Sequence, residues 1–280
     1  MRGDAVCGHS NHYTDEIRMT NKQPWALILG ASSGFGEATA LELARAGMNI
    51  FGVHLDRRDQ PGRVDGLQEK IRQVGRECHF VNDNATLDDT RKECVAELAR
   101  RVADSAGTLR VIFHSLAFAA FKPLVGAEEV INRPQLELAE DVMGNSLIYW
   151  VQECLWAGLL DRGARVFAMT SAGGARVWPQ YGPVGAAKAV LEAHIRQLAV
   201  ELAPAGITAN AILAGVTDSN ALRQIPGHEK LLEAARQRNP SRRLTQPEDV
   251  ARTVAVLCHP ATYWLTGNVL RVDGGESIVG

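Results

Sequence analysis

The sequence predicts an α/β protein with one doubly wound parallel sheet of about seven strands and helices on both faces. Two observations predict it. Short apolar runs alternate with helix-like patterns from Trp25 onward, which indicates repeated strand–helix–strand units. The first apolar run leads into a glycine-rich loop, as in Rossmann-type sheets that bind a nucleotide. We expect a single domain at residues 23–280, preceded by a disordered leader at residues 1–22.

The expected strands are short apolar runs. They cover residues 26–29, 49–53, 79–81, 111–113, 165–169, 208–213 and 269–272. The expected helices cover residues 34–46, 66–74, 87–106, 138–160, 183–202 and 248–258. Gly47, Gly75 and Gly107 follow the first three helices, where glycine commonly ends a helix. Thr86 is the expected N-cap of the third helix, and Pro183 opens the fifth, where proline is favoured.

Right-handed crossovers leave a ligand crevice beyond the carboxyl ends of such strands. Residues 216–240 lie at that end, between the sixth strand and the last helix, and are expected to form a lid.

The composition is that of an ordinary globular protein, with 46% hydrophobic residues, 22% charged residues and a formal net charge of −2. These values argue against whole-chain disorder, and they offer neither a nucleic-acid footprint nor a polybasic membrane patch. No run of about 18 apolar residues predicts a membrane span. We therefore expect no nucleic-acid and no membrane partner.

The cysteine pattern favours a reducing, cytoplasmic location. The five cysteines are odd in number and widely spaced, without a C-x-x-C pair. Cys7, His9 and His12 could be imagined as metal ligands, but a solvated leader is the favoured interpretation, and we expect no metal site.

The glycine loop has the pattern G-x-x-x-G-x-G. Its expected cofactor-binding residues are Gly30, Ser32, Ser33, Gly34, Phe35 and Gly36. Glycine allows a sharp turn and brings backbone N–H groups close to a diphosphate at the helix N-terminus. The alternative is an ordinary tight turn, but the place of the loop between first strand and first helix favours a nucleotide.

The residues after the second strand bear on the choice of dinucleotide. Asp56 could accept the ribose hydroxyls of NADH, whereas Arg57 and Arg58 could pair with the 2′-phosphate of NADPH. Because two arginines follow the one acid, we expect NADPH, with NADH as the alternative. A solvated charge run is the remaining interpretation.

Ser171, Tyr181 and Lys188 form the expected catalytic group, since the serine follows the fifth strand and the other two flank the start of a helix. With the glycine loop, this group resembles the short-chain dehydrogenase/reductase family from Trp25 to the C-terminus. The other matching features are Asn145, Asn210-Ala211, Pro247-Glu248-Asp249-Val250-Ala251 and Val272-Asp273-Gly274-Gly275.

Two departures from the usual family pattern narrow the resemblance. Val184 stands four positions before Lys188, and the tyrosine stands at Y-x6-K spacing instead. The segment His114-Ser115-Leu116-Ala117 replaces the usual Asn-Asn-Ala-Gly. Both features are similar to the enoyl-acyl-carrier-protein reductase branch. Residues 214–238 and the serine ten positions before the tyrosine resemble its NADPH-dependent Bacillus-type subgroup.

The tyrosine spacing has a chemical reason. In enoyl thioester reduction the hydride adds to Cβ, while negative charge develops on the more distant thioester oxygen. A shift of three positions is about one helical turn, or ~5 Å. This displacement of the tyrosine is of the same order as the distance between the carbon that receives the hydride and the thioester oxygen. The alternative is that Tyr181 is an ordinary loop aromatic in an inactive site.

The resemblance implies roles for the site residues. Tyr181 would stabilise the enolate and Lys188 would hold the nicotinamide ribose. Ser171 would match the usual family serine, and Asn145 would keep the long helix open around a link to Lys188. Ser115 and Leu116 would line the cofactor, Asn84 and Ala85 would flank the adenine, the Thr217 backbone would meet the carboxamide, and Ser219 would meet the diphosphate.

Other residues carry two interpretations. We expect His114, His194 and His259 to be structural. Trp178, Phe118 and Phe121 could form an acyl pocket or belong to the core, and Leu222, Ile225, Leu231 and Leu232 could cover an acyl chain or simply pack the lid. Arg236, Arg238, Arg242 and Arg243 could receive an acidic carrier protein or form a solvated surface run.

The helices at 138–160 and 183–202 are apolar around much of their circumference, which predicts a subunit interface. The resemblance implies a homotetramer.

The first hypothesis is an NADPH-dependent reductase of trans-2-enoyl thioesters, carried on acyl carrier protein. The alternatives are a carbonyl or hydroxyl oxidoreductase of the same family and a nonenzymatic nucleotide-binding regulator.

Overall fold

The computed structural model describes residues 22–56, 63–225 and 227–279. They form one seven-stranded sheet in the order β3-β2-β1-β4-β5-β6-β7, in which every neighbouring pair is parallel. The strands are β1 (Pro24–Leu29), β2 (Asn49–His54), β3 (Cys78–Asn82), β4 (Thr108–His114), β5 (Leu160–Thr170), β6 (Thr208–Ala214) and β7 (Val269–Val272). The predicted fold class is confirmed.

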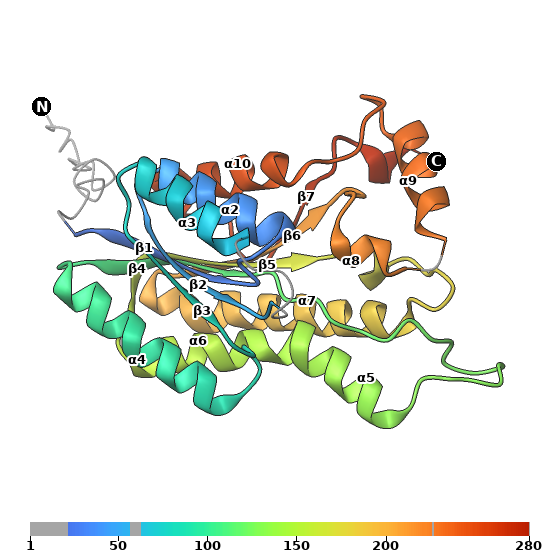
Figure 1. Ribbon diagram of the computed structural model, residues 1–280, viewed down its shortest axis with the longest axis horizontal. Helices are drawn as coiled ribbons and strands as arrows, with labels where there is room; N and C mark the ends of the chain where they lie inside the picture. The colour runs from blue at the N-terminus through green and yellow to red at the C-terminus, as the bar shows by residue number, and fades with distance from the viewer. Residues whose placement is uncertain (1–21, 57–62, 226, 280) are drawn as a thin grey trace, which may run out of the picture.

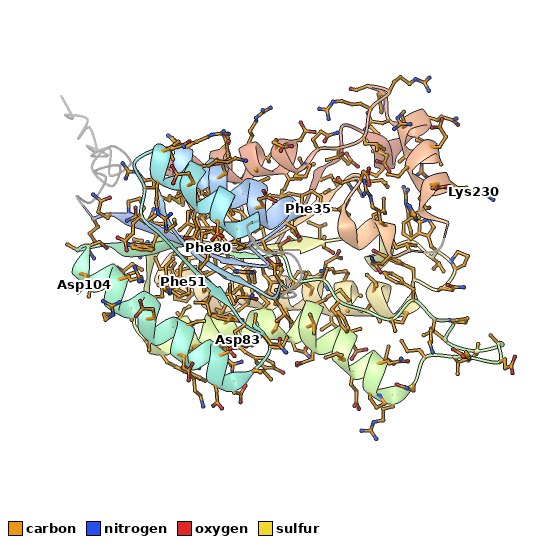
Figure 2. All side chains as sticks on the ribbon, viewed as in Figure 1. Phe35, Phe51, Phe80, Asp83, Asp104 and Lys230 are labelled. Atoms are coloured by element: carbon orange, nitrogen blue, oxygen red, sulfur yellow. The ribbon has the colours of Figure 1, made fainter. Side chains whose placement is uncertain are left out.

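Helices cover both faces of this sheet (Figure 1). The helices are α2 (Gly34–Arg45), α3 (Arg63–Gln73), α4 (Asp88–Asp104), α5 (Arg133–Glu140), α6 (Ser146–Trp156), α7 (Gly182–Leu202), α8 (Asn220–Arg223), α9 (His228–Arg238) and α10 (Pro247–Leu257). One buried cluster joins the sheet to α4, α6 and α7, and a second joins it to α2, α3 and α10. Figure 2 shows side chains filling the space between these layers, Phe51 among them.

The strand order reverses direction at β1, whose neighbours are β2 and β4. At such a switch point the crossovers leave to opposite sides, and doubly wound sheets bind their ligands beyond the carboxyl ends of the two strands, here β1 and β4. The glycine loop and the segment after His114 both begin there.

The prediction of one helix at 138–160 is wrong. Asn132 forms a capping box with Gln135, so α5 begins at Arg133. A π-helical turn, Asp141–Asn145, then separates α5 from α6, and Gly158 turns the chain into β5 with a φ of 66°. An extra residue in a helical turn is a local feature that hydrophobic periodicity does not report.

The predicted N-cap at Thr86 is also wrong. Its hydroxyl donates to Asn84 Oδ1 at 2.8 Å, and Leu87 occupies the N-cap position of α4. The loop after β3 therefore uses Thr86 to hold itself together. Strands β4 and β5 extend beyond the predicted 111–113 and 165–169, because parallel pairing continues past the apolar runs.

In the described residues, no helix is both long and apolar enough to cross a membrane.

Candidate active site

The glycine loop packs backbone directly on backbone. Gly30 has a φ of 86°, and a Cβ placed on it would lie 2.6 Å from the carbonyl oxygen of Ser115. A Cβ on Gly36 would collide with the carbonyl oxygen of Gly30. Ser33 is the extended N-cap of α2, so the first-turn N–H groups of Gly34 and its successors face the loop. Such a loop leaves room for an anionic group at the helix N-terminus.

The Asp56 carboxylate faces this loop from the end of β2. Its Oδ1 accepts a hydrogen bond from the buried Ser32 hydroxyl at 2.7 Å, and its Oδ2 lies 3.1 Å from His54 Nδ1. Burial lowers the pKa of His54, and the nearby Asp56 charge opposes that shift. Arg57 and Arg58 lie outside the described residues, as do Cys7, His9 and His12.

The loop after β3 is fixed by its own polar groups. Asn84 Oδ1 accepts from the backbone N–H of Thr86, and the carbonyl of Ala85 accepts from Trp150 Nε1 at 2.8 Å. The loop is thereby tied to α6. Phe35 is partly buried and packs on the core cluster that joins the sheet to α2, α3 and α10.

The segment after β4 lies against the glycine loop. The N–H of Ser115 donates to the Leu29 carbonyl at 2.8 Å, and half-buried Leu116 packs under α5 and α7. The predicted cofactor residues Gly30 and Ser115 are therefore brought together at the switch point.

Tyr181 stands immediately before α7 with its ring enclosed. Its hydroxyl lies 3.1 Å from Ser171 Oγ. Phe121 stacks on the ring at 6.1 Å between centroids, and Trp178 meets it edge-on at 5.8 Å. A Cβ on Gly173 would collide with the ring, so glycine is required there. Burial raises the pKa of Tyr181, while the Ser171 hydrogen bond opposes the shift.

Lys188 lies on α7 and is 5% exposed. Its ammonium donates to the Met169 carbonyl at 2.8 Å, at the carboxyl end of β5. Burial lowers the pKa of Lys188 to about 8, and the Glu192 charge opposes the shift. Sequence reasoning missed Glu192, which accepts from the Thr170 hydroxyl at 2.6 Å. Its position four residues after Lys188 on a helix was the available signal.

Asn145 ends the π-helical turn, and its Oδ1 lies 3.0 Å from His194 Nε2 on α7. The side-chain bond of Lys188 goes to Met169, so the described contacts do not join Asn145 to Lys188 directly. His114 Nε2 lies 2.8 Å from Ser146 Oγ, and burial lowers the pKa of His114 to about 3. His194 therefore links α7 to the π-helical turn, and His114 links the end of β4 to the start of α6. His259, by contrast, caps the short 3₁₀ turn Pro260–Thr262, where its Nδ1 accepts from the N–H of Ala261.

The segment after β6 passes beside the C-terminal residues. The Thr217 hydroxyl donates to the Gly215 carbonyl, and Ser219 Oγ accepts from the N–H of Leu222 at the start of α8. Phe118 is 61% exposed, whereas Leu231 and Leu232 of α9 are half-buried.

The arginines considered for a carrier surface have partners close by. Arg236 pairs with Glu233, Arg238 with Glu276, Arg243 with Asp249, and Arg242 donates to the Gln237 carbonyl. Pairing of this kind favours the interpretation as a solvated surface run.

Comparison with known proteins identifies the family of the chain. A family model described as Enoyl-(Acyl carrier protein) reductase matches residues 30–277, which include the glycine loop and the Ser171, Tyr181 and Lys188 group. The chain belongs to this family.

The relatives of this chain within the family differ from one another in substrate and in cofactor. The chain is 32% identical to 1-cyclohexenylcarbonyl-CoA reductase of Streptomyces collinus over 91% of its length and 87% of that protein. A solved NADH-type enoyl-[acyl-carrier-protein] reductase of Aquifex aeolicus is 28% identical, with a TM-score of 0.77 over 92% of this chain and 98% of that one. The Bacillus cereus enoyl-acyl carrier protein reductase, solved with NADP+, is 26% identical, with a TM-score of 0.81 over 93% and 98%.

Proposed function

We propose that this protein reduces the trans-2 double bond of an enoyl thioester with a nicotinamide dinucleotide. The observation that carries the proposal is the Tyr181 hydroxyl, 3.1 Å from Ser171 Oγ and seven positions before the buried Lys188. A tyrosine placed before α7, rather than four residues before the lysine, suits a reaction whose charge develops away from the carbon that receives the hydride.

A dinucleotide fits the residues present, because Gly30 and Gly36 let the loop fold tightly against Ser115 and the N-terminus of α2, where backbone N–H groups can meet an anion. The reduced nicotinamide, when bound, supplies the hydride. We propose NADPH as the preferred cofactor and NADH as the alternative. The adjacent Arg57 and Arg58 support NADPH, as does the NADP+ in the Bacillus cereus relative. The NADH-type Aquifex relative and the Asp56 carboxylate support the alternative.

In the proposed reaction, negative charge develops on the thioester oxygen of the substrate. A Tyr181 hydroxyl that donates to this oxygen stabilises the enolate, and its raised pKa keeps it protonated near neutral pH. Lys188 would hold the nicotinamide ribose hydroxyls and would add a positive charge near the developing anion. Ser171 orients the tyrosine hydroxyl, and Asn145 supports α7 through His194.

The remaining predicted contacts belong to the same proposal. Ser32, Ser33, Gly34 and Phe35 would cradle the diphosphate, Asn84 and Ala85 would flank the adenine, and Ser115, Leu116, Thr217 and Ser219 would line the nicotinamide half. Residues 216–240 would cover the acyl chain as a lid, with Trp178 and Phe121 beside the reacting end.

We propose acyl carrier protein as the carrier, a homotetramer as the assembly and the cytoplasm as the location. The family model supports the carrier, while the Streptomyces relative acts on a coenzyme A thioester. Cys78, Cys94, Cys154 and Cys258 are all free thiols, as in a reducing compartment.

The deciding experiment compares initial rates on crotonyl-acyl carrier protein, crotonyl-coenzyme A and matched 3-oxoacyl thioesters, each with NADPH and NADH. We expect the enoyl substrates to be reduced and the 3-oxoacyl substrates to be left unchanged. Faster reduction of the 3-oxo group would favour the carbonyl reductase instead, which the Ser171–Tyr181 pair also allows. Dinucleotide binding without turnover on any substrate would favour the regulator.

A further inference from the structure

The last residues of the described chain contact the lid region and the loop that leads to Tyr181. Asn239, at the end of α9, donates its side chain to the Asp273 carbonyl at 2.9 Å. Arg176, in the loop between Ser171 and Tyr181, donates to the Ser277 carbonyl at 2.6 Å. Figure 1 shows the C-terminal end beside α9. This short segment is thus fixed to the lid region and to the tyrosine loop.

The sequence Asp273-Gly274-Gly275 explains the shape of the segment. Gly274 and Gly275 have φ values of 60° and 86°, which glycine adopts without strain. The Asp273 carboxylate accepts from the N–H groups of Gly275 and Ser277 at 3.0 and 3.1 Å. The turn directs Glu276 inward, where it is 7% exposed.

Glu276 reaches the segment that follows β6. Its Oε2 accepts a hydrogen bond from the backbone N–H of Val216 at 2.9 Å, and its Oε1 lies 3.5 Å from an Arg238 nitrogen. A Cβ on Gly215 would collide with Thr245 Oγ1 and lie 2.9 Å from Glu276 Oε2. The backbone at Gly215–Thr217 is therefore held between Thr245 and the Glu276 carboxylate.

We infer that Glu276 is a positioning residue for dinucleotide binding: its carboxylate fixes the Val216 N–H and thereby the backbone of Thr217. This inference rests on the proposed function, in which the Thr217 backbone meets the nicotinamide carboxamide. Removal of a buried acceptor frees the Val216 N–H and lets the segment relax, so the cofactor must then reorder it on binding.

Two variants separate the reach of the side chain from its charge. Glu276→Gln keeps a carbonyl oxygen at the position that faces Val216, while it removes the negative charge from Arg238. Glu276→Asp keeps the charge but withdraws the oxygen by one methylene group. We expect the dissociation constants of NADPH and NADH to rise about tenfold in the aspartate variant and less than about threefold in the glutamine variant. The control is Glu93→Gln, which changes an exposed carboxylate on α4, outside the proposed lid.

The measurement is a fluorescence titration of the full chain with each dinucleotide, together with thermal unfolding of the cofactor-free protein and the kcat and KM of the enoyl assay. A rise in cofactor KM at nearly constant kcat supports positioning. Equal dinucleotide binding by the aspartate and wild-type proteins would overturn the inference, and so would equal losses of binding in both Glu276 variants. Loss of folding in the aspartate variant would also overturn it, because Glu276 would then have a purely structural role. A wild-type protein that binds neither dinucleotide would instead refute the proposed function.

Discussion

Tyr181 is positioned by residues of its own loop and by Phe121, which comes from the segment after β4. Phe121 and Trp178 enclose its ring, Gly173 leaves room for it, and Ser171 meets its hydroxyl. The ring is therefore held with one polar atom directed at a polar partner, as a donor to a developing oxyanion needs to be.

Replacement of Tyr181 by phenylalanine removes that hydroxyl and keeps the ring packing. We expect kcat for an enoyl thioester to fall by a factor on the order of 10² to 10³, as is typical when one oxyanion donor is lost. Thermal unfolding should change little. Tyr263→Phe, at a half-exposed tyrosine far along the chain, is the control. Retention of most activity by Tyr181→Phe would remove the tyrosine from the proposed mechanism.

We expect Lys188 to make the proposed reaction depend on pH. Burial lowers its pKa in the folded protein from 10.5 to about 8, so its ammonium form is lost as the pH rises through about 8. We expect kcat/KM to fall above this pH. The unfolded chain binds more protons between the two pKa values, so stability should rise with pH in that window.

Glu192→Gln tests the origin of this pH dependence. The glutamine can still accept from Thr170, but it no longer raises the pKa of Lys188. The alkaline limb of the pH–rate profile should therefore move to lower pH. Glu201→Gln, an exposed change near the end of α7, should leave the profile where it is. An unmoved limb in Glu192→Gln would mean that another group titrates.

At the scale of elements, the strand-to-helix junctions carry the site. The β1–α2 junction places Gly36 against the Gly30 carbonyl, and the β4 end places Ser115 against Gly30. The π-helical turn before α6 presents Asn145 to α7. The two glycine contacts depend on a close approach of backbone to backbone that a larger residue would prevent.

The glycine loop gives a matched pair of substitutions. In Gly36→Ala the new Cβ meets a backbone oxygen that cannot move aside, so we expect loss of dinucleotide binding and a lower melting temperature. In Gly66→Ala the new Cβ meets open space within α3, and the helix should be stabilised by about 0.5–1 kcal/mol. Calorimetric titration and thermal unfolding measure both effects. Normal cofactor binding by Gly36→Ala would contradict the proposal that the tight glycine loop is needed to bind the dinucleotide.

At the scale of the whole molecule, α6 and α7 leave apolar side chains on the surface. Trp156 is 75% exposed and Val200 is 70% exposed, although the inner faces of both helices are buried. Exposed apolar area of this kind favours self-association.

We expect sedimentation equilibrium to give the mass of a tetramer for the wild-type protein. Trp156→Glu places a charge on the α6 surface and should lower the mass, because a charge is costly to bury in an interface. Glu69→Gln, an exposed change on α3, is the control. A wild-type monomer would refute the assembly.

The sequence determined the class of fold and most of the candidate site. Apolar periodicity located every strand of the described residues. The glycine spacing marked the loop that meets Ser115 at the switch point, and the Y-x6-K pattern marked Tyr181 and Lys188. Such signals are local, because they follow from backbone conformation and from burial on one element. The tertiary structure alone decided the π-helical turn, the Lys188 bond to Met169, the enclosure of Tyr181 and the contact of Glu276 with Val216. The π-helical turn is local but leaves no mark in hydrophobic periodicity. The Phe121–Tyr181 stacking and the Glu276–Val216 hydrogen bond join segments far apart in the chain, and such contacts depend on how the packed layers meet, which no single segment specifies.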